Sequence, residues 1–169
     1  MVIGNIITKR INIMGRLGLS INKKFVSQVL SLEEARKLKD LGIDLSGGAF
    51  IWRKLLQDWD RKNLEDKTNY LLEHNLPPVV MGFEQFDEIP TATASELFEF
   101  LPREFVNDGN VWNLSITPGP ENKYYIEYSD TPLGNPIISV SGTSLLSVSY
   151  KAILELLNLG INIENGRED

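Results

Sequence analysis

The sequence predicts an α+β fold, in which an antiparallel sheet with a central hairpin is covered on one face by about three to four helices. Two Ser/Thr-x-x-Glu sequences, at residues 31–34 and 93–96, are capping boxes that begin helices. Two alternating segments, 111–117 and 123–129, flank a Pro-Gly-Pro loop typical of a hairpin. Apolar residues at helical spacing over 145–159 indicate a further helix. Helices therefore lie both before and after an antiparallel hairpin.

The first predicted helix begins at Ser31 and is followed by a strand. Apolar residues recur every three positions from Leu32 to Leu41, and Gly42 supplies a left-handed stop. A Ser-Gly-Gly turn then precedes residues 49–52, which are aromatic and β-branched. We expect these four residues to form a strand.

Charged residues dominate the next segment, from 57 to 75. We interpret it as a surface loop that leads into a short helix, which ends before Pro77 and Pro78. The single histidine, His74, would then lie near a helix C-terminus, where a cation is favoured. Residues 79–83 are expected to form another short strand, and residues 84–90 a loop.

The second half of the chain carries the clearest patterns. A helix is expected from Thr93 to Leu101, where Pro102 stops it. The hairpin strands alternate, so each has one face that we expect to be buried. The side chains on those faces are Trp112, Leu114 and Ile116 in the first strand, and Tyr124, Ile126 and Tyr128 in the second. A strand at 136–141 precedes the last helix, which ends at Gly160.

Charge divides the chain at residue 30. Residues 1–30 contain no Asp or Glu and five basic side chains, whereas the other 139 residues contain 12 basic and 23 acidic ones, a balance of −11. Opposite fields favour contact between such segments, within one chain or between copies. We therefore divide the chain into a basic apolar arm (residues 1–30, "the arm"), an acidic α+β body (31–161) and a polar tail (162–169).

The arm has the pattern of an added strand more than that of a leader peptide. Its apolar residues alternate with polar ones or glycine over 11–13 and 17–21, and a signal peptide would instead need one continuous apolar core. An extended segment of this kind can add to a sheet edge of a partner. The residues that we expect to bind the partner are Arg10, Ile11, Ile13, Arg16, Leu17, Leu19, Ile21 and Lys23.

Four segments of the body carry a resemblance to a known group of proteins. The residues that carry the likeness are the capped helix Ser-Leu-Glu-Glu-Ala-Arg-Lys-Leu-Lys-Asp-Leu-Gly-Ile (31–43), Pro-Thr-Ala-Thr-Ala-Ser-Glu-Leu-Phe-Glu-Phe-Leu-Pro (90–102), Tyr-Tyr-Ile-Glu-Tyr (124–128) and the final Leu-Gly-Ile (159–161). Over about residues 29–161 the chain is similar to uncharacterised proteins of Bacteroidetes and their phages. This resemblance implies a phage or prophage setting and carries over no functional residues.

The residue inventory argues against most catalytic chemistry. The chain has no cysteine, which excludes thiolate sites. Its single histidine argues against Ser-His-Asp triads and excludes multi-histidine metal centres. Carboxylates cluster at Asp58/Asp60, at Glu65/Asp66 and at Glu84/Asp87/Glu88, in segments that we expect to be solvated. We predict no catalytic, cofactor-binding or metal-binding residues and no cofactor. An enzyme would need a deep pocket that gathers carboxylates with shifted pKa values.

Charge and composition limit the classes of partner that the protein can bind. A net charge of −6 argues against nucleic acid as the partner of the whole body, and no apolar run approaches the ~20 residues of a membrane span. Most aromatic residues are expected to pack in the core, whereas Tyr125 lies on the opposite strand face and is the candidate for an exposed contact.

We therefore expect a non-enzymatic structural or assembly protein whose arm binds a neighbouring subunit or a partner protein, as a homo-oligomer or within a larger assembly. Its expected location is the host bacterial cytoplasm or the virion. The alternative is an acidic inhibitor or immunity-type protein, whose body covers a basic site on a target protein.

Overall fold

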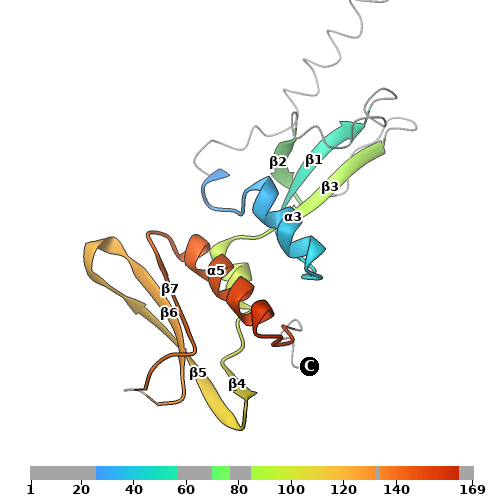
Figure 1. Cartoon of the computed structure of the whole chain (residues 1–169). Helices are drawn as coiled ribbons and strands as arrows, with labels where there is room; N and C mark the ends of the chain where they lie inside the picture. The colour runs from blue at the N-terminus through green and yellow to red at the C-terminus, as the bar shows by residue number, and fades with distance from the viewer. Residues whose placement is uncertain (1–25, 57–69, 77–84, 132–133, 164–169) are drawn as a thin grey trace, which may run out of the picture.

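The computed structural model describes residues 26–56, 70–76, 85–131 and 134–163, and it confirms the α+β class (Figure 1). Within these ranges there are three α-helices and two antiparallel sheets, with strand orders β2-β1-β3 and β4-β5-β6-β7. The expectation of one sheet with all helices on one face was wrong. Alternation shows which residues of a strand share a face, but it does not show which strands pair. The division into two sheets therefore could not be predicted from the sequence.

The first sheet is built around β1 (Phe50–Leu56), which pairs with β2 (Leu71–His74) and β3 (Gln85–Thr91). Two predictions were wrong here, because the segment expected to end a helix contains β2 and the loop expected at 84–90 contains β3. Both strands carry carboxylates that pair with Arg53 of β1, and these charges obscure the apolar alternation. Residues 57–69 and the strand expected at 79–83 lie outside the described residues.

Both capping boxes are confirmed. They begin α3 (Leu32–Asp40) and α4 (Ala94–Phe98), and in each the cap hydroxyl accepts from the N–H three residues on while the Glu carboxylate accepts from the cap N–H. Gly42 follows α3 with φ of 87°, so the predicted left-handed stop is also confirmed.

The second sheet contains the predicted strands and one more. β5 (Asn110–Pro118), β6 (Tyr124–Ser129) and β7 (Ile138–Gly142) correspond to the three predicted segments, and β5 and β6 pair antiparallel in the middle of the sheet. A 3-10 turn, η2 (Pro120–Asn122), lies between β5 and β6. The additional strand is β4 (Glu104–Asn107), which joins β5 through a two-residue turn with positive φ at Asp108 and Gly109.

The core lies where α5 (Leu145–Asn158) covers β6 and β7, while α3 packs on β3 of the first sheet (Figure 1). Ile126, Tyr128 and Leu156 are fully buried. Ile116 shares their sheet face but is 42% exposed, so its predicted burial was wrong.

Candidate protein-binding site

The eight residues expected to bind a partner all lie outside the described part of the chain. They are Arg10, Ile11, Ile13, Arg16, Leu17, Leu19, Ile21 and Lys23. The described structure begins at Val26 and therefore shows only how the base of the arm joins the body.

The base of the arm is anchored in the core. Val29 and Leu30, the last two residues of the arm, are 3% and 0% exposed. The Leu30 N–H donates to the carbonyl of Ala92 at 2.9 Å. Its carbonyl accepts from Trp52 Nε1 and from the Thr91 hydroxyl, both at 3.0 Å. Full burial of a leucine side chain stabilises by about 1.5–3 kcal/mol, so this junction is a firm attachment point.

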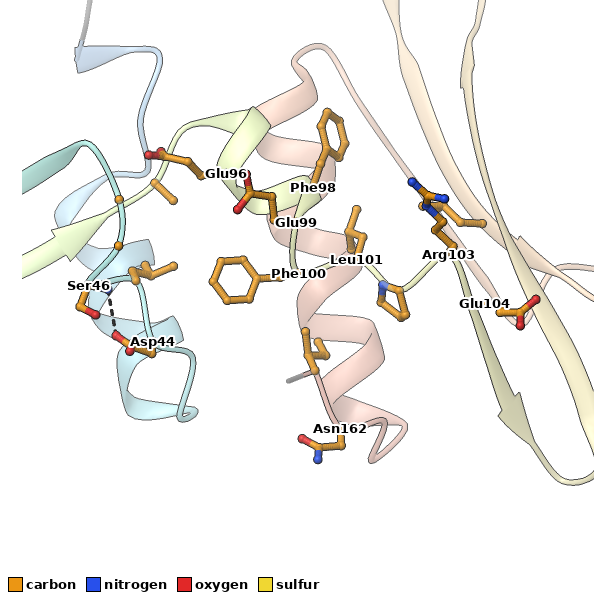
Figure 2. Close-up of a pocket in the computed structure, with 17 residues that line it drawn as sticks. Asp44, Ser46, Glu96, Phe98, Glu99, Phe100, Leu101, Arg103, Glu104 and Asn162 are labelled. Carbon is orange, nitrogen blue, oxygen red and sulfur yellow. Dashed lines mark hydrogen bonds between the residues drawn. The ribbon is translucent and has the colours of Figure 1, made fainter. Parts of the chain in front are cut away.

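A cleft of about 1140 Å³ lies between the loop that precedes β1 and the segment that leads into β4 (Figure 2). Loop 44–48 forms one wall, and segment 98–104 forms the other together with Leu114 of β5. Ala92, Glu96 and the C-terminal residues Asn162 and Ile163 complete the lining. The cleft therefore lies between a loop that leads into the first sheet and a segment that leads into the second.

Apolar side chains form part of the cleft lining. Leu101 and Ile163 are buried, and Phe98 and Phe100 are half-buried against the core. Figure 2 shows the Phe100 ring pointing from its segment toward the loop that carries Asp44 and Ser46. An extended peptide could thus place apolar side chains on this surface.

Four carboxylates and one guanidinium group surround that surface: those of Asp44, Glu96, Glu99 and Glu104, and that of Arg103. The Asp44 carboxylate accepts from the Ser46 N–H at 2.9 Å, and this hydrogen bond lowers its pKa. Glu96 accepts from the backbone N–H groups of Thr93 and Ala49, both at 2.7 Å. Glu99 and Glu104 are exposed. The lining is therefore acidic, with two of its carboxylates held by backbone donors.

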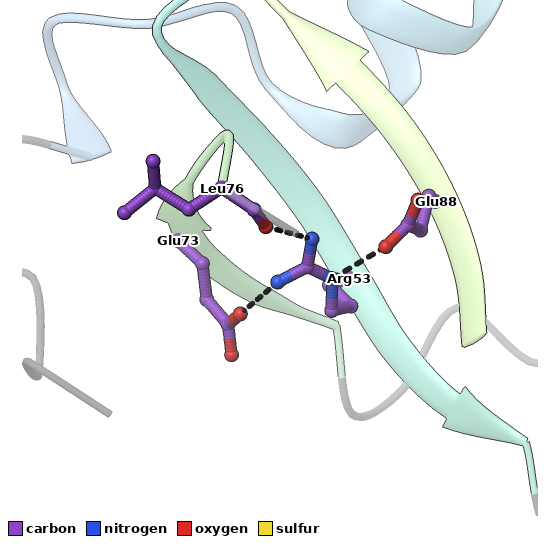
Figure 3. A network of polar contacts seen from close by, with 4 residues as sticks. All are labelled: Arg53, Glu73, Leu76 and Glu88. Carbon is purple, nitrogen blue, oxygen red and sulfur yellow. Dashed lines mark hydrogen bonds and ion pairs between the residues drawn. The ribbon is translucent and has the colours of Figure 1, made fainter. Parts of the chain in front are cut away.

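Arg53 ties the first sheet together (Figure 3). Its guanidinium group is bound by Glu73 at 2.6 Å and Glu88 at 2.7 Å, and it donates to the Leu76 carbonyl at 2.9 Å. The Arg53 side chain is only 8% exposed. The partners come from β2, from β3 and from the residues after β2, so the network has a structural function.

The other carboxylate of β3 belongs to a second cluster. Asp87 accepts from the Tyr70 hydroxyl, which itself accepts from Arg36 Nη2 at 2.6 Å. Burial and the neighbouring Asp87 raise the pKa of Tyr70 to about 12. The Arg36 guanidinium also lies 4.9 Å from the Tyr70 ring centroid, in cation–π geometry. Of the carboxylate clusters singled out in the sequence, Asp87 and Glu88 are thus bound in the body, and the other members lie outside the described residues.

The two remaining single residues also have defined places. His74 lies in β2, not at a helix end as predicted, and its ring stacks on Phe50 with centroids 5.1 Å apart. Tyr125, the candidate exposed contact, is half-buried in β6, and its ring lies against Gly119, where there is no room for a Cβ atom. Its contact surface for a partner is therefore limited.

The described ranges contain no cluster of three or more His, Asp or Glu side chains placed to bind a metal ion. No helix in those ranges combines the length and the apolar character that crossing a bilayer requires. Comparisons of the chain with protein-family models, with curated proteins and with solved structures found no match.

Sequence reasoning did not anticipate the cleft. Its walls lie some 50 residues apart in the chain, and no local pattern links them. Leu30 was assigned to the arm because the charge boundary coincides with the capping box, although its position next to a helix N-cap is where a hydrophobic staple residue is found. That motif was the one available signal.

Proposed function

We propose that this protein is a non-enzymatic assembly protein, in a phage or prophage setting, whose basic arm binds the acidic body of a neighbouring subunit. The observation that carries the proposal is the firm attachment of a +5 arm to a body of opposite charge. Leu30 is fully buried and hydrogen-bonded through both backbone groups, so the arm leaves the body at a defined point. The phage setting rests on the sequence resemblance alone.

The length of the arm supports binding between subunits. An extended chain spans about 3.3–3.6 Å per residue, so the 25 residues before Val26 could reach roughly 80–90 Å from the body. That distance exceeds the diameter of a domain of this size. Attraction between the arm and an acidic surface would also steer association of the subunits.

The acidic cleft favours one alternative function, that of an inhibitor whose body covers a basic site on a target protein. Glu99 and Glu104 are exposed carboxylates at the cleft, beside the aromatic side chains of Phe98 and Phe100. Such a surface complements a basic, partly apolar target. In this alternative the arm is dispensable for binding.

Native mass measured by light scattering tests the assembly proposal on the full chain. We expect a mass above the 19.1 kDa monomer at about 0.05 M salt and a shift toward the monomer at about 0.5 M, because salt screens charge contacts. Replacing Arg10, Arg16 and Lys23 by glutamine should give the monomer at both salt concentrations. A chain that is monomeric throughout would overturn self-assembly.

A matched variant controls for the loss of charge itself. Lys37 and Lys39 are exposed on α3 and Lys123 lies between η2 and β6, and their replacement by glutamine removes the same number of positive charges. We expect this variant to keep the mass of the parent chain. If both triple variants dissociate equally, net charge and not the arm controls assembly.

A further inference from the structure

We infer that the arm binds at the free edge of β4, where residues 17–21 add as a further strand beside the acidic cleft. This inference rests on the proposed function, since it names the surface that receives the arm. It combines three features of the described structure: an unpaired strand edge, an adjoining cleft lined by both apolar and acidic side chains, and a charge opposite to that of the arm.

The backbone of β4 presents unpaired groups along one side. The Leu114 N–H donates to the Arg103 carbonyl at 2.9 Å, and the register pairs Phe105 with Trp112. Bonded pairs alternate with non-bonded pairs in an antiparallel ladder, so residues 103, 105 and 107 bond to β5. The N–H and C=O groups of Glu104 and Val106 therefore point away from β5. Within the described part of the chain, β4 is the terminal strand of its sheet (Figure 1).

The side chains on this edge are suited to contact. Val106 is 68% exposed and Val111, paired with it on β5, is 46% exposed. An exposed apolar edge strand is a template for pairing with another chain unless charge, proline or a cover protects it. Glu104 supplies the only charge on β4, and its sign attracts the arm.

The other described edges are less accessible to an added strand. β3 contains Pro90, which has no N–H to donate, and α3 packs against it. On β7, Lys151 of α5 donates to the carbonyl of Ser141 at 3.0 Å. β2, four residues long like β4, belongs to a sheet centred on the buried Arg53, whereas β4 adjoins the cleft.

The cleft explains how an alternating segment would fit. Arg103 and Glu104 line it and also lead into β4, so a strand added to β4 would turn one face toward the cleft. Leu17, Leu19 and Ile21 share one face of an extended strand, and the half-buried rings of Phe98 and Phe100 are the apolar groups in the cleft lining that they would contact. Arg16 and Lys23 flank these residues, and the cleft offers four carboxylates against one guanidinium group.

The base of the arm lies beside the same cleft. Val29 forms a β-bridge with Thr93, between the cleft residues Ala92 and Glu96. Position 25 lies eight steps along the chain from position 17, which spans about 26–29 Å when extended. In the proposed assembly the arm occupies the β4 edge of a neighbouring subunit, and its own β4 edge is the competing site.

Amide hydrogen exchange followed by NMR on the full chain tests this inference. We expect the Glu104 and Val106 amides to exchange about tenfold or more slowly than in a full-chain variant with Leu17, Leu19 and Ile21 replaced by serine. The Phe105 amide is the internal reference, because it bonds to β5 with or without the arm. If it stays protected in the variant, the β4–β5 hairpin is intact.

Substitutions in β4 itself test the same contact through the strand that would receive the arm. Val106→Pro removes an outward N–H without removing a bond to β5, whereas Val106→Ala keeps that N–H. Only the proline variant should abolish the protection of Glu104 and lower the native mass. If neither variant changes the exchange of Glu104, β4 does not receive the arm.

Mass and exchange together separate this inference from the assembly proposal. If the serine variant of the arm lowers the mass while Glu104 and Val106 exchange freely in both chains, assembly stands and the β4 site is wrong. If the chain is monomeric but the two amides lose protection in that variant, the β4 site stands and the arm binds its own body.

Discussion

The two sheets are held together by different forces. In the second sheet, α5 covers β6 and β7, and fully buried Ile126, Tyr128 and Leu156 form the contact. In the first sheet, the central strand places Arg53 and Lys54 at 8% and 4% exposure, and Arg53 is bound by carboxylates from both neighbouring strands. One sheet thus depends mainly on apolar burial, whereas the other contains ion pairs at its centre. The same difference explains which strands could be predicted from the sequence and which could not.

The largest effect should come from the apolar sheet. Replacing the fully buried Leu156 by alanine should lower the free energy of unfolding by about 2–5 kcal/mol, because it removes buried methyl groups and leaves a cavity. Urea denaturation followed by circular dichroism measures this loss. Leu159, 40% exposed at the end of the same helix, is the matched control and should change stability by less than about 1 kcal/mol as alanine. Equal losses at both positions would contradict the assigned core.

An intermediate effect is expected in the charged sheet. Arg53→Met should lower the free energy of unfolding by about 2 kcal/mol. Breaking a fully buried ion pair lowers it by about 3–5 kcal/mol, but Glu73 and Glu88 are 36% and 38% exposed. The cost should shrink in high salt, whereas that of Leu156→Ala should not. Arg103→Met, at an exposed position, is the control. A cost that does not depend on salt would mean that Arg53 acts through packing alone.

These forces account for which elements could be predicted. Helices α3, α4 and α5 and strands β5 and β6 carry apolar side chains at regular spacing or begin at a capping box, and these local patterns predicted them. β2 and β3 were missed because Glu73, Asp87 and Glu88 interrupt the alternation, and their cationic partners Arg53 and Arg36 lie 20 to 51 residues away in the sequence. β4 was missed because four residues hold too little pattern.

The candidate site divides in the same way. The charge split and the alternation in the arm are local features, so the sequence supplies the segment expected to bind. The surface that receives it depends on tertiary contacts, because loop 44–48, segment 98–104 and Ile163 meet only after folding. The β4 edge becomes identifiable from the ladder register, which no local pattern specifies.

The smallest effect that distinguishes the two sheets should be visible only in alkali. The pKa of Tyr70, which directly precedes β2 of the charged sheet, is raised to about 12, and burial raises that of Tyr128 in the apolar sheet still further. A raised tyrosine pKa means that the folded protein keeps its proton after the unfolded chain, near pH 10, has lost it. The stability from this source is complete below pH 10 and is lost as pH rises through about 12.

Absorbance at 295 nm, which reports tyrosinate, measures this loss directly. We expect Tyr70→Phe to remove a transition near pH 12 and to make stability less sensitive to pH between about 10 and 12. Tyr125→Phe is the control, since that hydroxyl makes no contact with the Asp87 cluster. If Tyr70→Phe leaves both the titration and the alkaline stability unchanged, the hydrogen bond to Asp87 does not raise the pKa of Tyr70 in the protein in solution.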